Sequence, residues 1–178
     1  MTGVWMARVQ LRATPKGLLT MFSDTVNDIA GLLIDRGDTV SVAESSTGGL
    51  ISANLLSVPG ASAYFQGGSV VYTLASRRAF LNLDRDRVRQ LKPLTEEMVA
   101  EFARAAREKL DTTWGIAELG AAGPAGTPYG HAPGISVVAI SGPCSMSNTI
   151  QTSEDDRQSN MLAFTEAGLV LFRRALQT

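Results

Sequence analysis

The sequence predicts an α/β layered fold, and two observations carry that prediction. Strand-like apolar runs alternate along the chain with helix-like segments, which is the order typical of layered α/β proteins. The clearest run, at 135–140, is almost continuously apolar, as in strands that are buried on both faces of a sheet. The chain has 178 residues, enough for one domain with a sizeable core. We predict an N-terminal extension at 1–20 and a single α/β domain at 21–178.

The first half of the chain contains three predicted helices and two predicted strands. Apolar residues at helical spacing, followed by Gly37 as a C-terminal stop, indicate the first helix. Short β-branched or apolar runs indicate the strands, and the pair Pro59-Gly60 ends the second helix. The predicted ranges are 24–36, 50–57 and 75–81 for the helices and 39–43 and 68–72 for the strands.

The second half contains two further helices and three further strands. Thr95 is a suitable N-cap, and two glutamates follow it in the first turn, where the helix dipole favours negative charge. The predicted helices are 95–110 and 156–176, and the predicted strands are 114–117, 135–140 and 149–152. Residues 120–134 contain five Gly and three Pro, too many for a regular element. A loop of that length in a compact domain is typical of a functional segment, the alternative being a plain surface connection.

Composition excludes several classes of protein. A net charge of −1 gives no support to binding of nucleic acid or of an acidic membrane surface. No apolar run is long enough for a transmembrane helix, and the first twenty residues do not resemble a secretion signal, so we expect a cytoplasmic protein. Cys144 and His131 are each the only residue of their type in the sequence, which excludes an intramolecular disulfide and a typical zinc site. A Ser-His-Asp triad would have to use His131, in the Gly/Pro-rich loop; we assign His131 and Cys144 no role.

The stretch A-E-S-S-T-G-G at 43–49 is the first candidate for chemistry. It lies between a predicted strand and a predicted helix, at an end of the sheet where open α/β sheets bind ligands. A hydroxyl there could attack a carbonyl while backbone N–H groups from Thr47 to Gly49 stabilise the oxyanion. Gly48 and Gly49 would let backbone approach a ligand closely. The alternative is that Ser46 or Thr47 only caps the following helix.

Four motifs, taken in order, resemble those of the CinA C-terminal domain family, which includes stand-alone nicotinamide-nucleotide amidohydrolases. They are A-E-S-S-T-G-G at 43–49, S-V-P-G-A-S-A-Y-F at 57–65, G-G-S-V-V-Y-T at 67–73 and G-A-A-G-P at 120–124. The resemblance covers roughly residues 22–176. It implies a three-layer α/β/α sandwich with a mixed or mostly parallel sheet, a homodimer, and no metal or organic cofactor. The implied activity converts nicotinamide mononucleotide into nicotinate mononucleotide and ammonia, so the expected partner is a small pyridine nucleotide.

The same resemblance implies catalytic roles. The family motif is usually A-E-S-C-T-G-G, whose first serine is the nucleophile and matches Ser45, while its cysteine is Ser46 here. A family segment similar to T-Y-S-N-E-A-K supplies a tyrosine and a lysine that assist the serine, and these match Tyr72 and Arg77. Arginine stays charged, so Arg77 cannot accept the proton of Ser45 as lysine could.

Three interpretations of Arg77 remain. In one, its positive charge favours ionisation of Tyr72, and the tyrosinate acts as the base. In another, hydrolysis is lost and the protein is a non-catalytic nucleotide-binding paralog of the same fold. In the third, Arg77 is a solvated helix residue beside Arg78. We expect Ser45, Tyr72, Arg77 and Gly120 to converge on one cleft at the end of the sheet.

The remaining candidates would bind substrate. The family's typical (S/T)-G-I-A-G-P is represented by residues 119–124, where Leu119 replaces the hydroxyl residue and the glycines are kept. The stretch D-D-R-Q-S-N-M at 155–161 resembles the family's G-D-R-x-x-V-R, so Arg157 matches its first arginine and Met161 replaces its second. We expect Arg157 to contact a phosphate, the alternative being a local pair with Asp155 or Asp156. The predicted binding residues are Ser46, Thr47, Gly48, Gly49, Gly120, Gly123 and Arg157.

Overall fold

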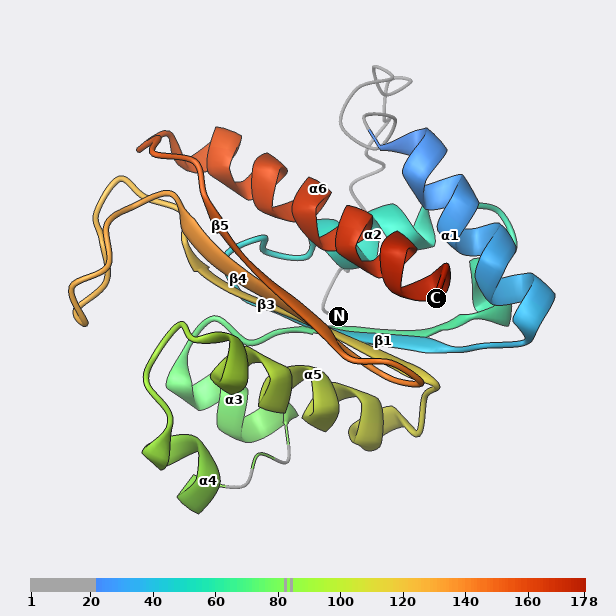
Figure 1. Cartoon of the computed structure of the whole chain (residues 1–178), viewed down its shortest axis with the longest axis horizontal. Helices are drawn as coiled ribbons and strands as arrows, with labels where there is room; N and C mark the ends of the chain where they lie inside the picture. Colours follow the sequence, from blue (N-terminus) through green and yellow to red (C-terminus); the bar gives the residue numbers. More distant parts are fainter. Residues whose placement is uncertain (1–21, 82, 84) are drawn as a thin grey trace, which may run out of the picture.

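The computed structural model describes residues 22–81, 83 and 85–178, so the predicted extension at 1–20 lies outside the described residues. One five-stranded sheet runs through the described part of the chain, in the order β2-β1-β3-β4-β5. Its strands are β1 (Val40–Glu44), β2 (Phe65–Val70), β3 (Trp114–Ala121), β4 (Ile135–Ser141) and β5 (Met146–Gln151). Helices cover both faces of this sheet, which gives the three layers predicted from the sequence (Figure 1).

The sheet is mixed. β1 pairs in parallel with both β2 and β3, whereas β3 with β4 and β4 with β5 are antiparallel pairs. The carboxyl ends of the three parallel strands therefore meet at one edge of the sheet. β1 ends at Glu44, directly before the A-E-S-S-T-G-G turn; β2 ends two residues before Tyr72; and β3 leads into the glycine loop. Ligands bind at such edges in open α/β sheets, so the topology alone places the candidate motifs together.

Each helical layer buries its own apolar cluster against the sheet. One layer contains α1 (Ser23–Arg36), α2 (Leu50–Leu56) and α6 (Arg157–Leu176), and the other α3 (Leu74–Phe80), α4 (Arg85–Gln90) and α5 (Glu96–Leu110) (Figure 1). In the first cluster, Trp114 of β3 meets Phe172 of α6 edge to face, with ring centroids 5.9 Å apart. In the second cluster, on the other face of the sheet, Phe102 of α5 packs with apolar residues of β1, β3 and β4. Among the described helices, none combines the length and apolar character needed to cross a membrane.

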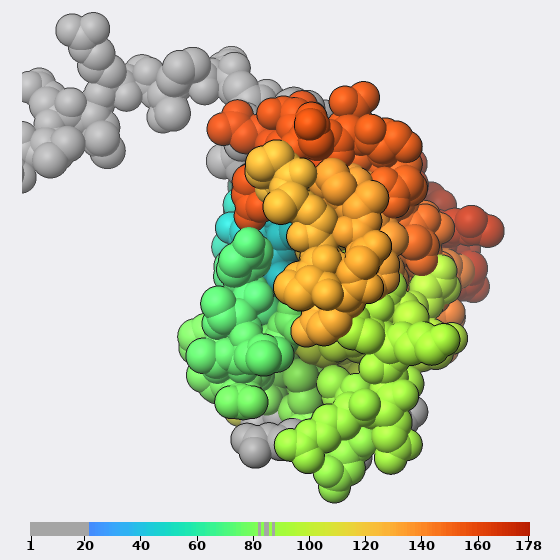
Figure 2. Space-filling model, turned by 90° about the vertical axis from the view of Figure 1, so that its left-hand side faces the viewer, coloured from blue at the N-terminus to red at the C-terminus, as the bar shows by residue number. Residues whose placement is uncertain are grey.

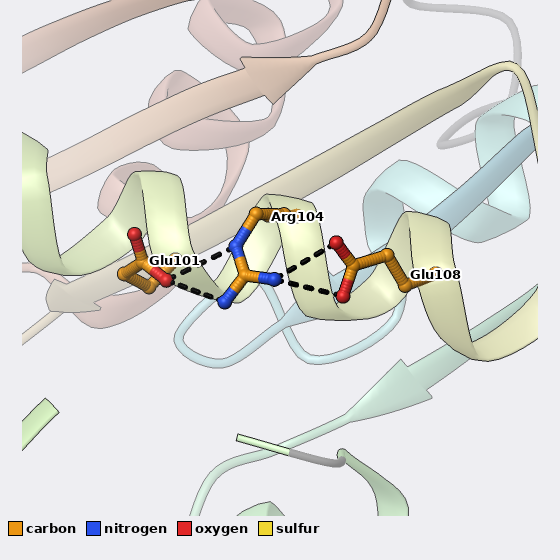
Figure 3. A network of polar contacts seen from close by, with 3 residues as sticks. All are labelled: Glu101, Arg104 and Glu108. Carbon is orange, nitrogen blue, oxygen red and sulfur yellow. Dashed lines mark hydrogen bonds and ion pairs between the residues drawn. The ribbon is translucent and has the colours of Figure 1, made fainter. Parts of the chain in front are cut away.

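Polar contacts cap the N-terminus of α5 and link three charged side chains along the helix. Thr95 caps the helix by accepting a hydrogen bond from the backbone N–H of Met98, as the sequence predicts. Along the helix, Arg104 forms ion pairs of 2.8 Å with the buried Glu101 and the exposed Glu108, one turn to either side (Figure 3). Pairs at these spacings support a helix only modestly, so the apolar inner face holds α5 in place.

Three strands differ from the sequence-based prediction by more than one residue, and one α-helix was not predicted. β2 begins three residues before the predicted 68–72, and β3 continues four residues beyond the predicted 114–117. β5 begins at Met146 instead of residue 149; it is an edge strand with mostly exposed polar side chains, so its start has no apolar signal. α4 was not predicted, because its sequence R-D-R-V-R-Q lacks an apolar stripe.

Candidate active site

A pocket of about 340 Å³ at the carboxyl edge of the parallel strands brings the candidate catalytic residues together. As expected from the sequence, Ser45, Tyr72, Arg77 and Gly120 all line it. The glycine loop lies beside the segment around residues 70–80 on this side of the molecule, in orange next to green (Figure 2). The pocket is lined by Ser45, Ser46, Tyr72, Leu74, Arg77, Gly120, Ala121, Ala122, Gly123, Ala125, Gly126, Thr127, Pro128, Tyr129 and Arg157.

A wholly buried carboxylate, Glu118 of β3, holds the turn that carries Ser45. One of its oxygens accepts hydrogen bonds from the backbone N–H groups of Ser45 (3.1 Å) and Thr47 (3.0 Å). Its other oxygen accepts from the hydroxyls of Ser46 and of Ser136, the latter at 2.8 Å. Ser46, which replaces the family's usual cysteine, therefore donates its hydroxyl to Glu118. The same carboxylate also fixes the backbone of Ser45 and of Thr47, on either side of Ser46.

A second buried carboxylate, Glu44, caps α2. It accepts hydrogen bonds from the backbone N–H groups of Ile51 (3.1 Å) and Ser52 (3.0 Å), and from the hydroxyls of Ser52 (2.6 Å) and Thr47 (2.7 Å). The sequence-based alternative, in which Ser46 or Thr47 caps this helix, is wrong, because Glu44 binds the N–H groups of its first turn. Those N–H groups are consequently not available to a ligand.

The predicted oxyanion donors, the N–H groups from Thr47 to Gly49, are partly occupied within the protein. The N–H of Thr47 donates to Glu118, and that of Gly48 donates to the carbonyl of Ser45 at 3.2 Å. Within the described residues, the N–H groups of Ser46 and Gly49 have no partner in the turn. Of these two residues, Ser46 lines the pocket.

The hydroxyl of Ser45 differs from those of its neighbours. Ser46 and Thr47 both donate to buried carboxylates, whereas the hydroxyl of Ser45 has no hydrogen-bond partner among the residues that the structure describes. Ser45 lines the pocket, although only 5% of the residue is exposed. A hydroxyl on a fixed backbone, with no partner in the described part of the chain, is free to act on a ligand.

Arg157 joins three segments around the pocket. Its Nη1 donates to the carbonyl of Gly123 at 2.9 Å, and its Nη2 to the hydroxyl of Tyr72 at 3.4 Å. Its guanidinium also lies over the ring of Tyr72. The alternative predicted from the sequence, a pair with Asp155 or Asp156, is not among the ion pairs of the described residues.

Arg77 is held against the protein and is not a solvated helix residue. Its Nε donates to the carbonyl of Val71 at 3.1 Å, and its guanidinium lies 5.4 Å from the centroid of the Phe102 ring. Burial lowers the pKa of Arg77 below its ordinary value, an effect that the nearby Tyr129 partly opposes. The side chain is therefore a partly desolvated cation on the lining of the pocket that Ser45 also lines.

Gly120 is needed for close packing beneath the pocket. A Cβ at this position would lie 2.6 Å from the Ser46 hydroxyl oxygen and 2.8 Å from the carbonyl oxygen of Ile135. Gly123 has a φ of 104°, and a Cβ there would lie 2.5 Å from the carbonyl oxygen of Asp155. Gly120 thus makes room for the contact between Ser46 and Glu118, while Gly123 brings the loop close to the start of α6.

Sequence reasoning missed Glu44, Glu118, Ser136 and Tyr129. The signal for Glu118 was present, because a carboxylate within the otherwise apolar run W-G-I-A-E-L-G-A requires buried donors. His131 bonds to Thr127 within its own loop, and the Cys144 thiol contacts the carbonyl of Ala175. In the described part of the chain, no group of three His, Cys, Asp or Glu side chains could hold a metal ion.

Comparison of sequences identifies relatives of the chain. The model of the family described as the CinA C-terminal domain matches residues 23–176. A CinA-like protein of Prochlorococcus marinus (strain MIT 9313) is 39% identical over 115 residues, which are 65% of this chain and 27% of that protein. A CinA-like protein of Chlorobium phaeobacteroides (strain BS1) is 33% identical over 156 residues, 84% of this chain and 37% of that protein. The chain thus spans about a third of the length of such curated relatives.

Solved structures share the fold. A competence or damage-inducible protein from Enterobacter asburiae superposes with a TM-score of 0.79 at 25% identity, covering 86% of this chain and 96% of that one. A competence/damage inducible protein from Agrobacterium tumefaciens gives the same TM-score at 23% identity, covering 94% and 100%. The mixed sheet with helices on both faces is therefore the architecture of these proteins too.

Proposed function

We propose, from the premise that this chain belongs to the CinA C-terminal domain family, that it hydrolyses the carboxamide of nicotinamide mononucleotide. The products would be nicotinate mononucleotide and ammonia. One observation carries the proposal: Ser45, whose hydroxyl has no hydrogen-bond partner among the described residues, lines a pocket that Tyr72 and two arginines also line. The turn that carries this hydroxyl is fixed by Glu118, so little reorganisation would be needed before attack.

The proposed chemistry follows acyl transfer through a serine. The Ser45 oxygen attacks the carboxamide carbon, its proton passes to a base, and ammonia leaves with a proton returned from that base. Water then attacks the acyl-serine, which releases the carboxylate and restores the hydroxyl. The N–H of Ser46, directly after the nucleophile, is the donor best placed for the oxyanion, as in other serine sites built on a strand-turn-helix.

Tyr72 is the proposed base, because Arg77 stays protonated. The Tyr72 hydroxyl accepts a hydrogen bond from Nη2 of Arg157 at 3.4 Å, so a cation contacts the proposed base. Arg77 would assist by its charge near the reacting group. Arg157 has a second proposed role, which is to bind the phosphate of the nucleotide.

A second candidate function is nucleotide binding without hydrolysis. The observation that favours it is the position of Arg77, where the family usually has a lysine that can deprotonate. The pocket, the turn and Arg157 would serve a binding protein equally well.

Ammonia release from purified protein given nicotinamide mononucleotide tests the proposal. We expect release matched mole for mole by nicotinate mononucleotide, and its loss in Ser45→Ala and in Tyr72→Phe with ligand binding retained. Ser57→Ala, which alters a serine outside the pocket, is the matched control and should keep wild-type release. Binding without release by the wild type would support the second function and exclude the first.

A further inference from the structure

The pocket around Ser45 has an unusual charge balance. Two arginines line it, Arg77 on α3 and Arg157 on α6, and within the described residues its lining includes no acidic side chain. Arg77 also lines a second pocket, which contains Phe102. The two arginines are held by different partners, Val71 and Phe102 for Arg77, and Gly123 and Tyr72 for Arg157. They therefore offer two separate points for anionic groups of a ligand.

The guanidinium of Arg77 has N–H donors that make no hydrogen bond within the described residues. Its Nε is used on the carbonyl of Val71, whereas neither Nη has a partner among the described residues. The guanidinium is partly buried against Phe102, and burial without an anion disfavours its charged form, which is why its pKa is lowered. Two Nη groups side by side match the two oxygens of a carboxylate, which is the strongest pairing that arginine makes.

A carboxamide fits Arg77 less well than a carboxylate does. The amide offers one acceptor oxygen to Arg77, and the N–H donors of its NH₂ group would face the N–H donors of the guanidinium. It also brings no negative charge to the desolvated cation. A lysine at this position would discriminate less, because an ammonium is a point charge without the planar fork of arginine.

We infer that this pocket is matched to a ligand with two anionic groups, a phosphate at Arg157 and a carboxylate at Arg77. It should therefore bind nicotinate mononucleotide more tightly than nicotinamide mononucleotide. The inference rests on the proposed function in one respect, that the pocket takes a pyridine nucleotide. Its consequence is that the deamidated nucleotide occupies the site in preference to the amide, so that an active enzyme would be inhibited by its own product.

Calorimetric titration of both nucleotides tests the inference. Ser45→Ala is titrated beside the wild type, so that turnover cannot convert the amide during the measurement. We expect the acid to bind about ten- to a hundredfold more tightly, the range of one charge-assisted pairing. Arg77→Met should abolish the preference and Arg77→Lys should reduce it. Arg78→Met, one residue along the same helix and outside this pocket, removes the same charge and should retain it.

The outcomes separate this inference from the proposed function. Equal affinities, tighter binding of the amide, or a preference that survives Arg77→Met would overturn the inference, whether or not ammonia is released. A preference for the acid without ammonia release would support the inference and reject the proposed hydrolysis. Failure of both nucleotides to bind would overturn the inference. If circular dichroism shows that Arg77→Met does not fold, the wild type and Arg77→Lys decide.

Discussion

The guanidinium of Arg157 lies 5.9 Å from the centroid of the Tyr72 ring, and its Nη2 reaches the phenol oxygen. Two residues 85 positions apart in sequence thereby form one side of the pocket. The sequence suggested that Arg77 would be the cation that influences Tyr72, but the structure gives that contact to Arg157. A phosphate bound at Arg157 would share the same guanidinium, so we expect a bound ligand to alter the contact between Arg157 and Tyr72.

Arg157→Ala should weaken a phosphorylated ligand far more than its dephosphorylated counterpart. A charge-assisted contact contributes about 1.5–3 kcal/mol, roughly ten- to a hundredfold in affinity. Titrations of nicotinamide mononucleotide and nicotinamide riboside would measure the difference. Arg173→Ala, on the same helix but paired with Asp28, is the control and should affect neither ligand. Equal losses for both ligands in Arg157→Ala would show that Arg157 does not bind the phosphate.

Arg77→Lys distinguishes an active enzyme from a scaffold that has lost its base. If the protein already hydrolyses nicotinamide mononucleotide with arginine in place, the swap should lower ammonia release, because the two side chains differ in reach and in donor geometry. If hydrolysis is lost, lysine restores a side chain that can deprotonate when desolvated, and the swap should create or raise release. Steady-state kinetics of the wild type and the variant would measure the change, with Arg78→Lys as the matched control. If neither protein releases ammonia from a nucleotide that demonstrably binds, the amidohydrolase proposal is to be abandoned.

Gly120→Ala should destabilise the protein by about 1–3 kcal/mol, the usual effect of forcing a methyl group into a packed site. The new Cβ would press on the Ser46 hydroxyl and on the carbonyl of Ile135. Gly31→Ala is the contrasting control, since its Cβ meets nothing within 4 Å and alanine favours the helix that contains it. Urea unfolding would show a loss for the first and a small gain for the second; similar effects would mean that the turn adjusts freely.

The ionisation of Asp156 makes the stability of α6 depend on pH. It caps the helix, and its hydrogen bonds with the side chain and backbone N–H of Ser159 hold the pKa of its carboxyl below the ordinary value of 3.8. The folded pKa is below the unfolded one, so the cap stabilises at higher pH and loses this effect as pH falls through the folded pKa. Asparagine also caps helices but does not titrate.

Unfolding of wild type and Asp156→Asn between about pH 3 and pH 6 measures that effect. The difference in stability between the two proteins should shrink toward acid pH. A difference that stays constant over this range would show that the ionised carboxyl contributes nothing to the cap.

The sequence predicted what depends on apolar patterning and on motif order. The run at 135–140 became the interior strand β4, and the turn at Ser45 came to the carboxyl edge of the sheet as strand-turn-helix patterns do. The sequence did not predict which hydrogen bonds the two buried carboxylates accept. Glu44 and Glu118 lie 74 positions apart, and only the parallel register of β1 with β3 places them directly opposite each other. Pairing across such a distance cannot be read from local sequence.

The relation between Glu118 and Ser45 bears on how this family can change over evolutionary time. Glu118 secures the turn by accepting from two backbone N–H groups and from the hydroxyls of Ser46, Thr47 and Ser136, while the hydroxyl of Ser45 makes no hydrogen bond within the described residues. Selection can therefore act on the reactive group and on the scaffold separately. If the proposed hydrolysis holds, loss of the Ser45 hydroxyl alone would remove the chemistry and leave the folded pocket as a receptor.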